Sequence, residues 1–515
     1  MRSATAPLLF LLLTFVVLSR PIFWTAHPPN FDFANFALGV DRFDPREHQP
    51  HPPGYPLVIL TARVFAAAGL SSVRALYATS LLGSIAAVLG AFFLGKRLAG
   101  EPGGLLAGLL LAAEPVFWRS GVSSPARVFL AAGVCWLLCG CLALAEGRRR
   151  WLWITPLLLA FAAGFRPELL LLFAAPCWLA ARMGGAGGSR VAVAAALSLA
   201  LSAPWVAWMA AAFGSAGELL YTYYHYFLHH ASTTSALFGA HAAAWKGMLW
   251  NSLAWNSLPA VVALVSVLLC RAGATIDRRF FALAAAYLLP ALAIQLAVHE
   301  GADTPDHSLG TIAVLCVAGG SALGTCARAS LRRAAVAAAA LAAMLCFSFA
   351  APGKLPPRLD LLSLRSFAKS QQQLAETLGG LRSLLRSGDA LLVLNDSPLS
   401  WRILEYEFPQ VVTLGLDATL QENSTEFPGG WQFLGWRRKA LSETGIALPA
   451  AQRLQIFSSP AGPQRKLVLE RLCSQLPCQA SGARLEAAVG RWQGTLALPP
   501  YTLQLGLSRP PGADR

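Results

Sequence analysis

The chain has 515 residues, of which 55% are hydrophobic and only 13% are charged. Ordinary soluble domains contain roughly 25% charged residues, so this composition, with a mean hydropathy of +0.52, excludes a purely soluble enzyme. It also excludes disorder, collagen-like repeats and a disulfide-rich secreted module. A net charge of +15 would suggest nucleic acid as the partner of a soluble protein. In so apolar a chain, basic loops of a polytopic membrane protein explain the charge better, and we expect no nucleic acid partner.

Eleven apolar segments are long enough to cross a bilayer as helices. They run over approximately 7–24, 74–95, 102–118, 125–145, 151–165, 168–182, 191–213, 248–270, 280–298, 308–326 and 334–351. With the N-terminus in the cytoplasm, every turn on that side is basic, which is the positive-inside pattern. The odd number of spans then places the chain after residue 351 on the outer side. A cleaved signal peptide is the alternative for the first segment.

The composition shifts near Ala351, where three prolines mark a linker. We therefore expect a transmembrane domain over 1–351 and an extracytoplasmic accessory domain over 352–515. An amphipathic helix over 366–386 precedes apolar runs and a second helix, an alternation that predicts a small α/β unit with a mainly parallel sheet. The expected strands cover 389–396, 411–416, 454–457 and 466–472, and the second helix covers 398–408. Cys473 and Cys478 are either a disulfide or two thiols.

The first outer loop, about residues 25–73, contains the densest polar chemistry of the membrane half. Its proline-rich stretch at 50–56 predicts a turn at the membrane surface, and residues 56–68 predict a helix lying along the interface. Asp32 stands among aromatic and small apolar residues. Burial there would raise the pKa of its carboxylate, as suits a general base. The alternative is a helix N-cap.

Simpler roles explain the other acids and histidines of this loop. Asp41 and Asp44 flank Arg42, and we favour local pairing with Arg42 or Arg46 in a solvated turn. His48 and His51 have a spacing that suits a metal, but the prolines between and after them interrupt any helix that would align them. A substrate contact is the alternative for both histidines.

Further polar residues follow on the same predicted face, where a carboxylate, cations, histidines and aromatic rings converge. This set suits an anionic, lipid-linked substrate, because an arginine fork can donate two parallel hydrogen bonds to phosphate. Arg166 is the first candidate for that cation, followed by Lys246 and Arg119. Solvated acids, snorkelling arginines and an interfacial belt of aromatic residues remain the simpler explanation.

Several stretches resemble one family of membrane enzymes. They are FDFANFALG at 31–39, FDP at 43–45, HQPHPPGYPL at 48–57 and GFRP at 164–167. These resemble a bacterial branch of the GT-C glycosyltransferases, similar to protein O-mannosyltransferases and to the aminoarabinose transferases of lipid A. The resemblance covers the membrane half and is strongest over residues 30–60.

The resemblance implies a multi-helix membrane body, interfacial helices in the first outer loop and a hexosyl- or pentosyltransferase activity. By position, the resemblance implies that Asp32 is the general base that takes a proton from the acceptor. The donor becomes a polyprenyl-phosphate sugar, transferred with inversion to a lipid, glycan or protein acceptor. We expect substrate contacts from Asp44, His48, His51, Tyr55, Glu114, Arg166, Lys246 and His299.

The chain departs from the family pattern at residues 123–127, where no second acid stands near the start of the fourth span. We therefore assign no metal ligand, and a divalent metal stays open as a cofactor. The competing class is a non-enzymatic membrane protein, either a lipid or sugar transporter or an inactive scaffold. A transporter should show ionisable residues deep in its spans and an internal repeat, and neither is evident. The expected location is the inner (plasma) membrane.

Overall fold

A computed structural model describes the chain over the following residues, with gaps between them: 5–233, 245–269, 277–298, 305–325, 330–355, 357–394, 399–417, 431–434, 437–440, 446–448, 453–457, 491–494 and 501–503. These residues form two compact units that do not follow chain order. The helical unit comprises Met1–Ala26 and Pro52–Lys369, and the mixed unit comprises His27–His51 and Ser370–Arg515.

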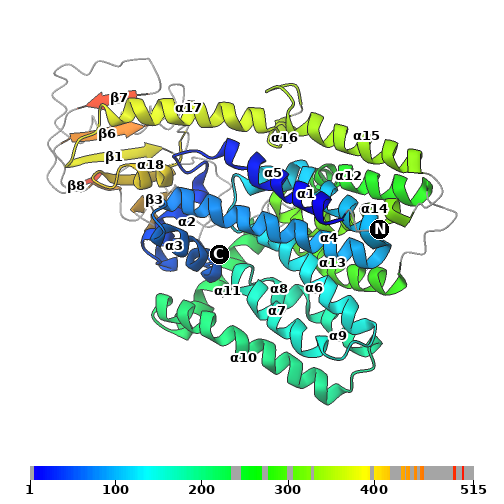
Figure 1. Ribbon diagram of the computed structural model, residues 1–515. Helices are drawn as coiled ribbons and strands as arrows, with labels where there is room; N and C mark the ends of the chain where they lie inside the picture. The colour runs from blue at the N-terminus through cyan, green and yellow to red at the C-terminus, as the bar shows by residue number, and fades with distance from the viewer. Residues whose placement is uncertain are drawn as a thin grey trace. The chain divides into compact units, whose positions relative to one another are not determined.

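The helical unit contains long apolar helices and short connecting ones (Figure 1). They are α1 (Thr5–Ser19), η1 (Pro21–Phe23), α3 (Pro56–Ala67), α4 (Ser72–Ala113), α5 (Pro115–Gly121), α6 (Val128–Ala145), α7 (Trp151–Phe165), α8 (Leu169–Leu172), α9 (Ala174–Met183), α10 (Gly188–Phe213), α11 (Ala216–Thr233), α12 (Trp245–Leu269), α13 (Arg278–Val298), η4 (Pro305–Ser308), α14 (Leu309–Thr325), α15 (Ser330–Ser348) and α16 (Pro357–Asp360). All eleven predicted apolar segments contain helix. Among the described residues, five helices are long and apolar enough to span a membrane: Ala6–Phe23, α4, α6, α10 and Pro305–Thr325.

The longest of these helices, α4, has 42 residues and is broken at Ala99 and Gly100. Gly100 has φ +68°, a left-handed conformation that glycine adopts without strain, and Pro102 follows it. A Cβ on Gly104 would lie 2.6 Å from the carbonyl of Phe92, and one on Gly108 would lie 3.5 Å from that of Val88. The two halves therefore fold back on each other, so the predicted segments 74–95 and 102–118 are two antiparallel arms.

The second arm ends earlier than predicted, at Ala113. Glu114 begins a new helix, because its Oε2 accepts a hydrogen bond of 2.7 Å from the backbone N–H of Phe117. Pro115 occupies the first position of α5, where its missing N–H is not needed. Segment 168–182 is likewise divided into α8 and α9.

Side-chain contacts group the turns at two ends of the helical unit. Arg97 pairs with Glu146 and so joins the turn after the first arm of α4 to the turn after α6. At the other end, Arg127 Nη1 lies 2.8 Å from His307 Nδ1, which joins the turn before α6 to the turn before α14. This grouping matches the alternation expected of successive spans.

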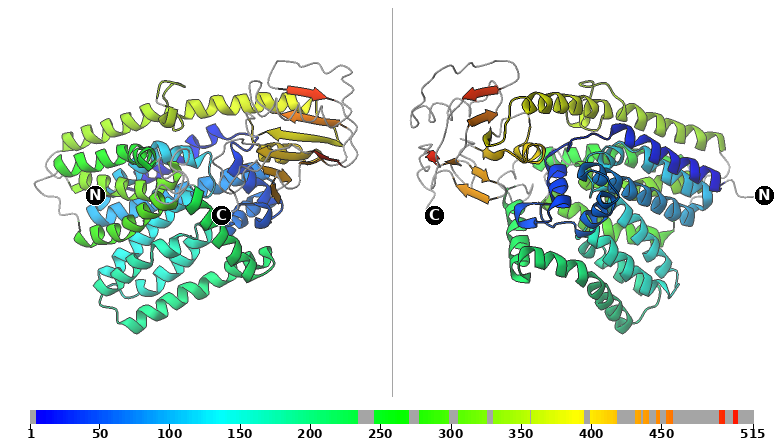
Figure 2. Two further views of the ribbon diagram at one scale, coloured as in Figure 1. Left: turned by 180° about the vertical axis from the view of Figure 1, so that it is seen from behind. Right: turned by 60° about the vertical axis from the view of Figure 1, so that its left-hand side comes forward.

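Small residues bring the central helices close together. A Cβ on Gly320 of α14 would lie 2.3 Å from the backbone nitrogen of Ala107 in α4. Such close backbone approach is typical of membrane helix pairs, which gain van der Waals contact where side chains are small. Figures 1 and 2 show α14 along α4, and α10 packed on α7.

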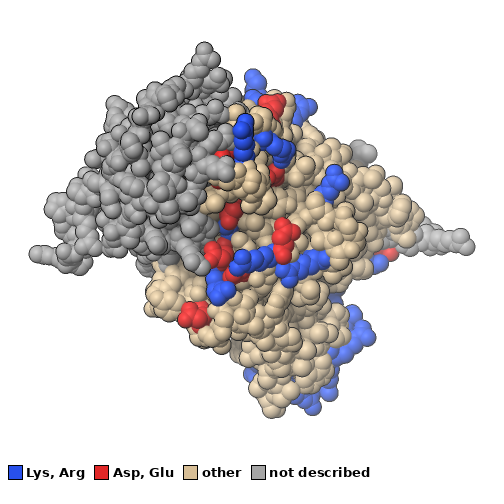
Figure 3. Space-filling model, turned by 90° about the vertical axis from the view of Figure 1, so that its left-hand side faces the viewer, with Lys and Arg blue, Asp and Glu red and all other residues tan. Residues whose placement is uncertain are grey.

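The outer surface of α7 is apolar. Trp153, Leu157 and Phe161 recur every fourth residue and are 45–60% exposed. In Figure 3 the lower part of the face, where Figure 1 places α7 and α10, is almost free of charged side chains except at its margin. A continuous apolar face of this kind suits lipid contact, and the protein is a multi-pass membrane protein.

The mixed unit contains a six-stranded sheet in the order β4-β3-β2-β1-β6-β7. Its elements are α2 (Phe31–Asp41), η2 (Pro45–Glu47), most of α17 (Leu364–Arg382), β1 (Asp389–Leu394), α18 (Trp401–Glu407), β2 (Val412–Asp417), β3 (Trp431–Leu434), β4 (Arg437–Ala440), β5 (Ile446–Leu448), β6 (Arg453–Phe457), β7 (Arg491–Gly494) and β8 (Tyr501–Leu503). β1 lies at the centre, parallel to β2 and β6.

The expectation of a mainly parallel sheet is wrong for the outer strands, because β3, β4 and β7 pair antiparallel. Two-residue connections such as that between β3 and β4 permit only antiparallel pairing, since a parallel crossover needs a dozen residues or more. The predicted strand at 466–472, together with Cys473 and Cys478, lies outside the described residues.

The apolar face of α17 forms the core of this unit. Leu374, Leu378 and Leu381 of α17, with Leu385 just after it, are buried in one cluster with Leu391 and Val393 of β1 and Ile403 and Leu404 of α18. Ala34 of α2 belongs to the same cluster. The first-loop helix is therefore part of the core that the distant C-terminal residues build.

Close contact between α2 and the proline-rich turn can be tested at Gly39. A Cβ there would lie 2.8 Å from the backbone carbon of Gln49 and the nitrogen of Pro50, neither of which can move without shifting the turn. We expect Gly39→Ala to destabilise the protein by about 1–3 kcal/mol, measured as a lower melting temperature in detergent. In α17, a Cβ on Gly379 would have no other atom within 4 Å, so Gly379→Ala should leave the melting temperature unchanged or raise it. Equal melting temperatures for the two variants would contradict this packing.

Candidate functional site

Asp32 lies in the first turn of α2, where its negative charge suits the helix dipole. The helix is capped by Asn30, whose side-chain oxygen accepts a hydrogen bond of 2.9 Å from the backbone N–H of Phe33. The N-cap alternative for Asp32 is therefore wrong. The expected burial is wrong as well, because the Asp32 side chain is 51% exposed. Its carboxylate is thus open to solvent and to a substrate.

One histidine of the proline-rich turn, His51, lies beside this carboxylate, and His48 lies near His51. His51 Nδ1 is 3.6 Å from Asp32 Oδ1, longer than a normal hydrogen bond but within range of electrostatic attraction. The His51 ring stands edge-on to Phe36, and its centroid is 6.5 Å from that of His48. Both histidines are buried, whereas Asp32 is exposed. Among the described residues, no three His, Cys, Asp or Glu side chains gather as a metal site would need.

Asp44 holds the turn that precedes these histidines. Its carboxylate pairs with Arg46 at 3.1 Å and with Arg42 at 3.2 Å, as the local-pairing interpretation predicted. The turn is not solvated around it, since the Asp44 side chain is buried. Burial alone would raise the pKa of Asp44, but the hydrogen bond and charge of Arg46, with the charge of Arg42, lower it below the ordinary value. Asp41 is exposed at the end of α2.

The residue that fixes this loop is Arg402 of α18, which sequence analysis missed. Its guanidinium is fully buried and donates to Asn35 Oδ1 of α2 at 2.6 Å, to Glu405 at 2.6 Å and to the backbone carbonyl of Glu47. Burial lowers the pKa of Arg402, and the Glu405 carboxylate opposes that shift. Asn35 and Arg402 are 367 residues apart, so no local pattern could have paired them.

A second set of candidates belongs to the helical unit. Arg166 is 3% exposed and pairs with Glu168, and its guanidinium lies 5.3 Å from the centre of the Tyr55 ring, within cation–π range. Its Nη1 atom is buried without a hydrogen-bond partner among the described residues. Tyr55 itself is buried, with a left-handed φ of +45°. Near it, the Tyr223 hydroxyl donates to the carbonyl of Pro53 at 2.7 Å.

Arg119 is the other predicted cation that the structure describes. Its guanidinium lies 3.9 Å from the centre of the Phe367 ring, and its Nε and Nη1 atoms have no partner among the described residues. Arg127, which contacts Asp306 and His307, was not singled out from the sequence, because its partners come from a turn 180 residues away.

Three further candidates have different outcomes. The buried carboxylate of Glu114 caps α5, so its first role is local. The side chain of Lys246 and the whole of His299 lie outside the described residues. The candidate residues therefore divide into an acid-bearing group at His27–His51 in one unit and a cationic group at Arg166 in the other.

Comparison with known proteins places the fold. No protein-family model and no curated protein matches the chain. Among solved structures, ArnT from Cupriavidus metallidurans bound to undecaprenyl phosphate aligns over 85% of this chain and 98% of its own, with a TM-score of 0.54 and 12% identity. The chain has the GT-C fold.

A second GT-C protein, the oligosaccharyltransferase AglB from Archaeoglobus fulgidus in complex with an inhibitory peptide and a dolichol-phosphate, aligns over 78% of this chain and 63% of its own. Its TM-score is 0.45 at 13% identity. At 12% identity the likeness to ArnT concerns the fold alone. The resemblance drawn from the first-loop motifs is confirmed at that level.

The buried Arg402 network gives a direct test. Arg402→Met would leave Asn35 Oδ1 and the Glu47 carbonyl without their donors, and we expect a loss of about 2–4 kcal/mol in stability. Limited proteolysis should show faster cleavage within residues 27–51. Arg382→Met is the matched control on α17. Its side chain is exposed and lies 3.3 Å from Glu407, so this pair at the surface should be worth roughly 0–1 kcal/mol. Similar cleavage rates for both variants would contradict the role of Arg402.

Proposed function

We propose that the protein is a membrane glycosyltransferase that moves a sugar from a polyprenyl-phosphate donor to an acceptor hydroxyl on the outer face of the inner membrane. The observation that carries this proposal is an exposed carboxylate, Asp32, in the first turn of a first-loop helix within a GT-C fold. ArnT, which shares the fold, was solved with undecaprenyl phosphate. We further propose a hexosyl- or pentosyltransferase with its N-terminus in the cytoplasm and its C-terminal residues outside.

In the proposed reaction Asp32 accepts the proton of the acceptor hydroxyl as that oxygen attacks the anomeric carbon. The bond from the anomeric carbon to the phosphate oxygen breaks, and the polyprenyl phosphate leaves with the electron pair. Attack from the face opposite the leaving group inverts the anomeric centre. His51, 3.6 Å from Asp32, is suited to orient the carboxylate and to stabilise its charge when the imidazole is protonated.

The leaving phosphate needs a cation, and Arg166 supplies a buried guanidinium with one N–H group unused by the described residues. A buried donor without a partner costs about 1–3 kcal/mol, and an anionic oxygen would satisfy it. Glu168 and the Tyr55 ring hold the guanidinium in place. Arg119 is the next candidate, because two of its nitrogens are likewise unpartnered.

Asp32→Asn tests the base. Asparagine keeps the shape of the side chain but cannot take the proton, so sugar transfer should fall by at least about 100-fold. The melting temperature should change little, because Asn30 caps the helix. Donor affinity should also change little, because the donor phosphate is assigned to Arg166. Asp41→Asn, at the exposed end of the same helix, is the control and should transfer sugar at nearly the normal rate. Near-normal transfer by Asp32→Asn would remove this residue from the mechanism.

Arg166→Lys tests the phosphate contact. Lysine keeps the charge but loses the planar fork, so we expect the affinity for undecaprenyl phosphate to fall roughly tenfold, or about 1.4 kcal/mol. Arg182→Lys at the exposed end of α9 should bind as the unmodified protein does. Binding to protein in detergent can be measured by titration calorimetry. Unchanged affinity of Arg166→Lys would assign the phosphate to another cation, with Arg119 tested next.

A further inference from the structure

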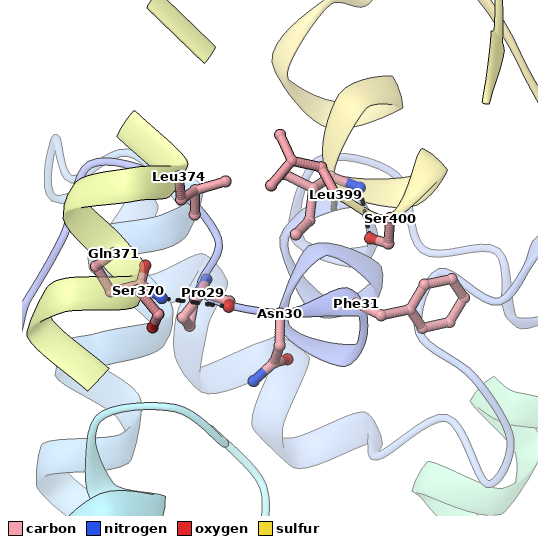
Figure 4. A pocket seen from close by; sticks show the side chains of 9 residues that line it. Pro29, Asn30, Phe31, Ser370, Gln371, Leu374, Leu399 and Ser400 are labelled. Atoms are coloured by element: carbon pink, nitrogen blue, oxygen red, sulfur yellow. Dashed lines mark hydrogen bonds between the residues drawn. The ribbon is translucent and has the colours of Figure 1, made fainter. Parts of the chain in front are cut away.

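The mixed unit contains a small pocket beside the start of α2 (Figure 4). Residues 29–31 form one wall, α17 contributes Gln371 and Leu374, and the start of α18 contributes Leu399 and Ser400. Its volume is about 260 Å³, slightly below the roughly 300–1,000 Å³ of sites for drug-sized ligands. The pocket therefore has room for one small group rather than for a lipid chain.

Gln371 gives the pocket an unsatisfied hydrogen-bond acceptor. Its side chain is only 7% exposed and extends from α17 toward Pro29, whose carbonyl accepts a hydrogen bond of 3.4 Å from Nε2 (Figure 4). This bond fixes the amide orientation, since only the NH₂ group can donate. Oε1 is then left buried with no partner among the described residues. A buried acceptor without a partner costs free energy, and a bound ligand with an O–H or N–H donor would remove that cost.

The other residues that line the pocket indicate which class of ligand would supply this hydrogen-bond donor. No charged side chain is among the described residues that line the pocket, so a phosphate or an ammonium group would find no counter-charge there. Leu374 and Leu399 present apolar surface from opposite sides (Figure 4), and Ser400 adds a hydroxyl. A neutral ring with one apolar face and hydroxyls at its edge matches these walls.

The pocket also lies next to the proposed base along the chain. Asn30 and Phe31 line it, and Asp32 follows at once, with adjacent Cα atoms about 3.8 Å apart. We propose that this pocket binds a neutral sugar ring of the acceptor, with one ring hydroxyl donating to Gln371 Oε1. The identification of this ligand as the acceptor rests on the proposed function. The donor phosphate is excluded from this pocket by the lack of positive charge.

Binding can be tested without turnover. Full-length protein in detergent is titrated with methyl β-D-glucoside, methyl β-D-galactoside and methyl α-D-mannoside, followed by saturation-transfer NMR. At least one glycoside should bind, and Gln371→Met should weaken it by roughly tenfold. Gln373→Met, the same substitution at an exposed position of α17, should have no effect. Leu374→Phe, which narrows the pocket without touching Gln371, should also weaken binding.

The outcomes separate this inference from the proposed function. Absence of binding by all three glycosides, or equal affinity of Gln371→Met and unmodified protein, would overturn the pocket assignment. Binding of a serine peptide in place of the glycosides would overturn the carbohydrate class. In a parallel assay without acceptor, slow release of sugar from polyprenyl-phosphate donors tests donor use. Absence of that release in unmodified protein would contradict the proposed function, and the control Gln373→Met should release sugar at the unmodified rate.

Discussion

A guanidinium taken out of water must find its hydrogen-bond partners inside the protein, because an unpaired buried charge is strongly destabilising. Arg402 meets this requirement with Asn35 of α2, the carbonyl of Glu47 and Glu405 of its own helix. The first loop and the start of the C-terminal part are thereby held in one unit. The apolar cluster of α17, β1 and α18 adds Ala34 to the same contact. The position of the exposed carboxylate depends on this network.

This arrangement changes how the C-terminal part is understood. Its sequence predicts an accessory α/β unit without catalytic motifs. Its helices α17 and α18 nevertheless pack against α2 and line the pocket beside Asn30 and Phe31. Loop residues that act on a substrate need a rigid support. Here α17 and α18 provide that support, and both helices pack on the sheet around β1.

The helical unit obeys a different constraint. Polar side chains in a membrane protein are costly unless they pair or function, and several partly or fully buried cations of this unit are paired. Arg97 meets Glu146, Arg127 meets Asp306 and His307, and Arg166 meets Glu168. Among the described residues, Arg20, Arg119 and Arg166 each keep at least one buried guanidinium nitrogen without a hydrogen-bond partner. Unused donors of this kind are where an anionic ligand would be stabilised most.

The sequence by itself determined the helices, because apolar length and local capping signals act over a few residues. Segment 151–165 matches α7 at both ends, and the break near Gly100 and Pro102 separates two arms as their conformational preferences require. The resemblance to GT-C proteins stated from the sequence is confirmed at the level of the fold. The sequence also singled out Asp32, but it could not choose between base and cap, since Asn30 and Asp32 both favour a helix start.

Tertiary structure decided everything that depends on residues far apart in the chain. The burial of Asp44 and the exposure of Asp32 are of this kind, because both follow from how the first loop packs. The pairing of Asn35 with Arg402 and the meeting of residues 29–31 with Gln371 join segments more than 340 residues apart. No local pattern encodes such contacts, because they result from packing in three dimensions. The antiparallel pairing of β7 with β6 also depends on segments that are distant in the chain.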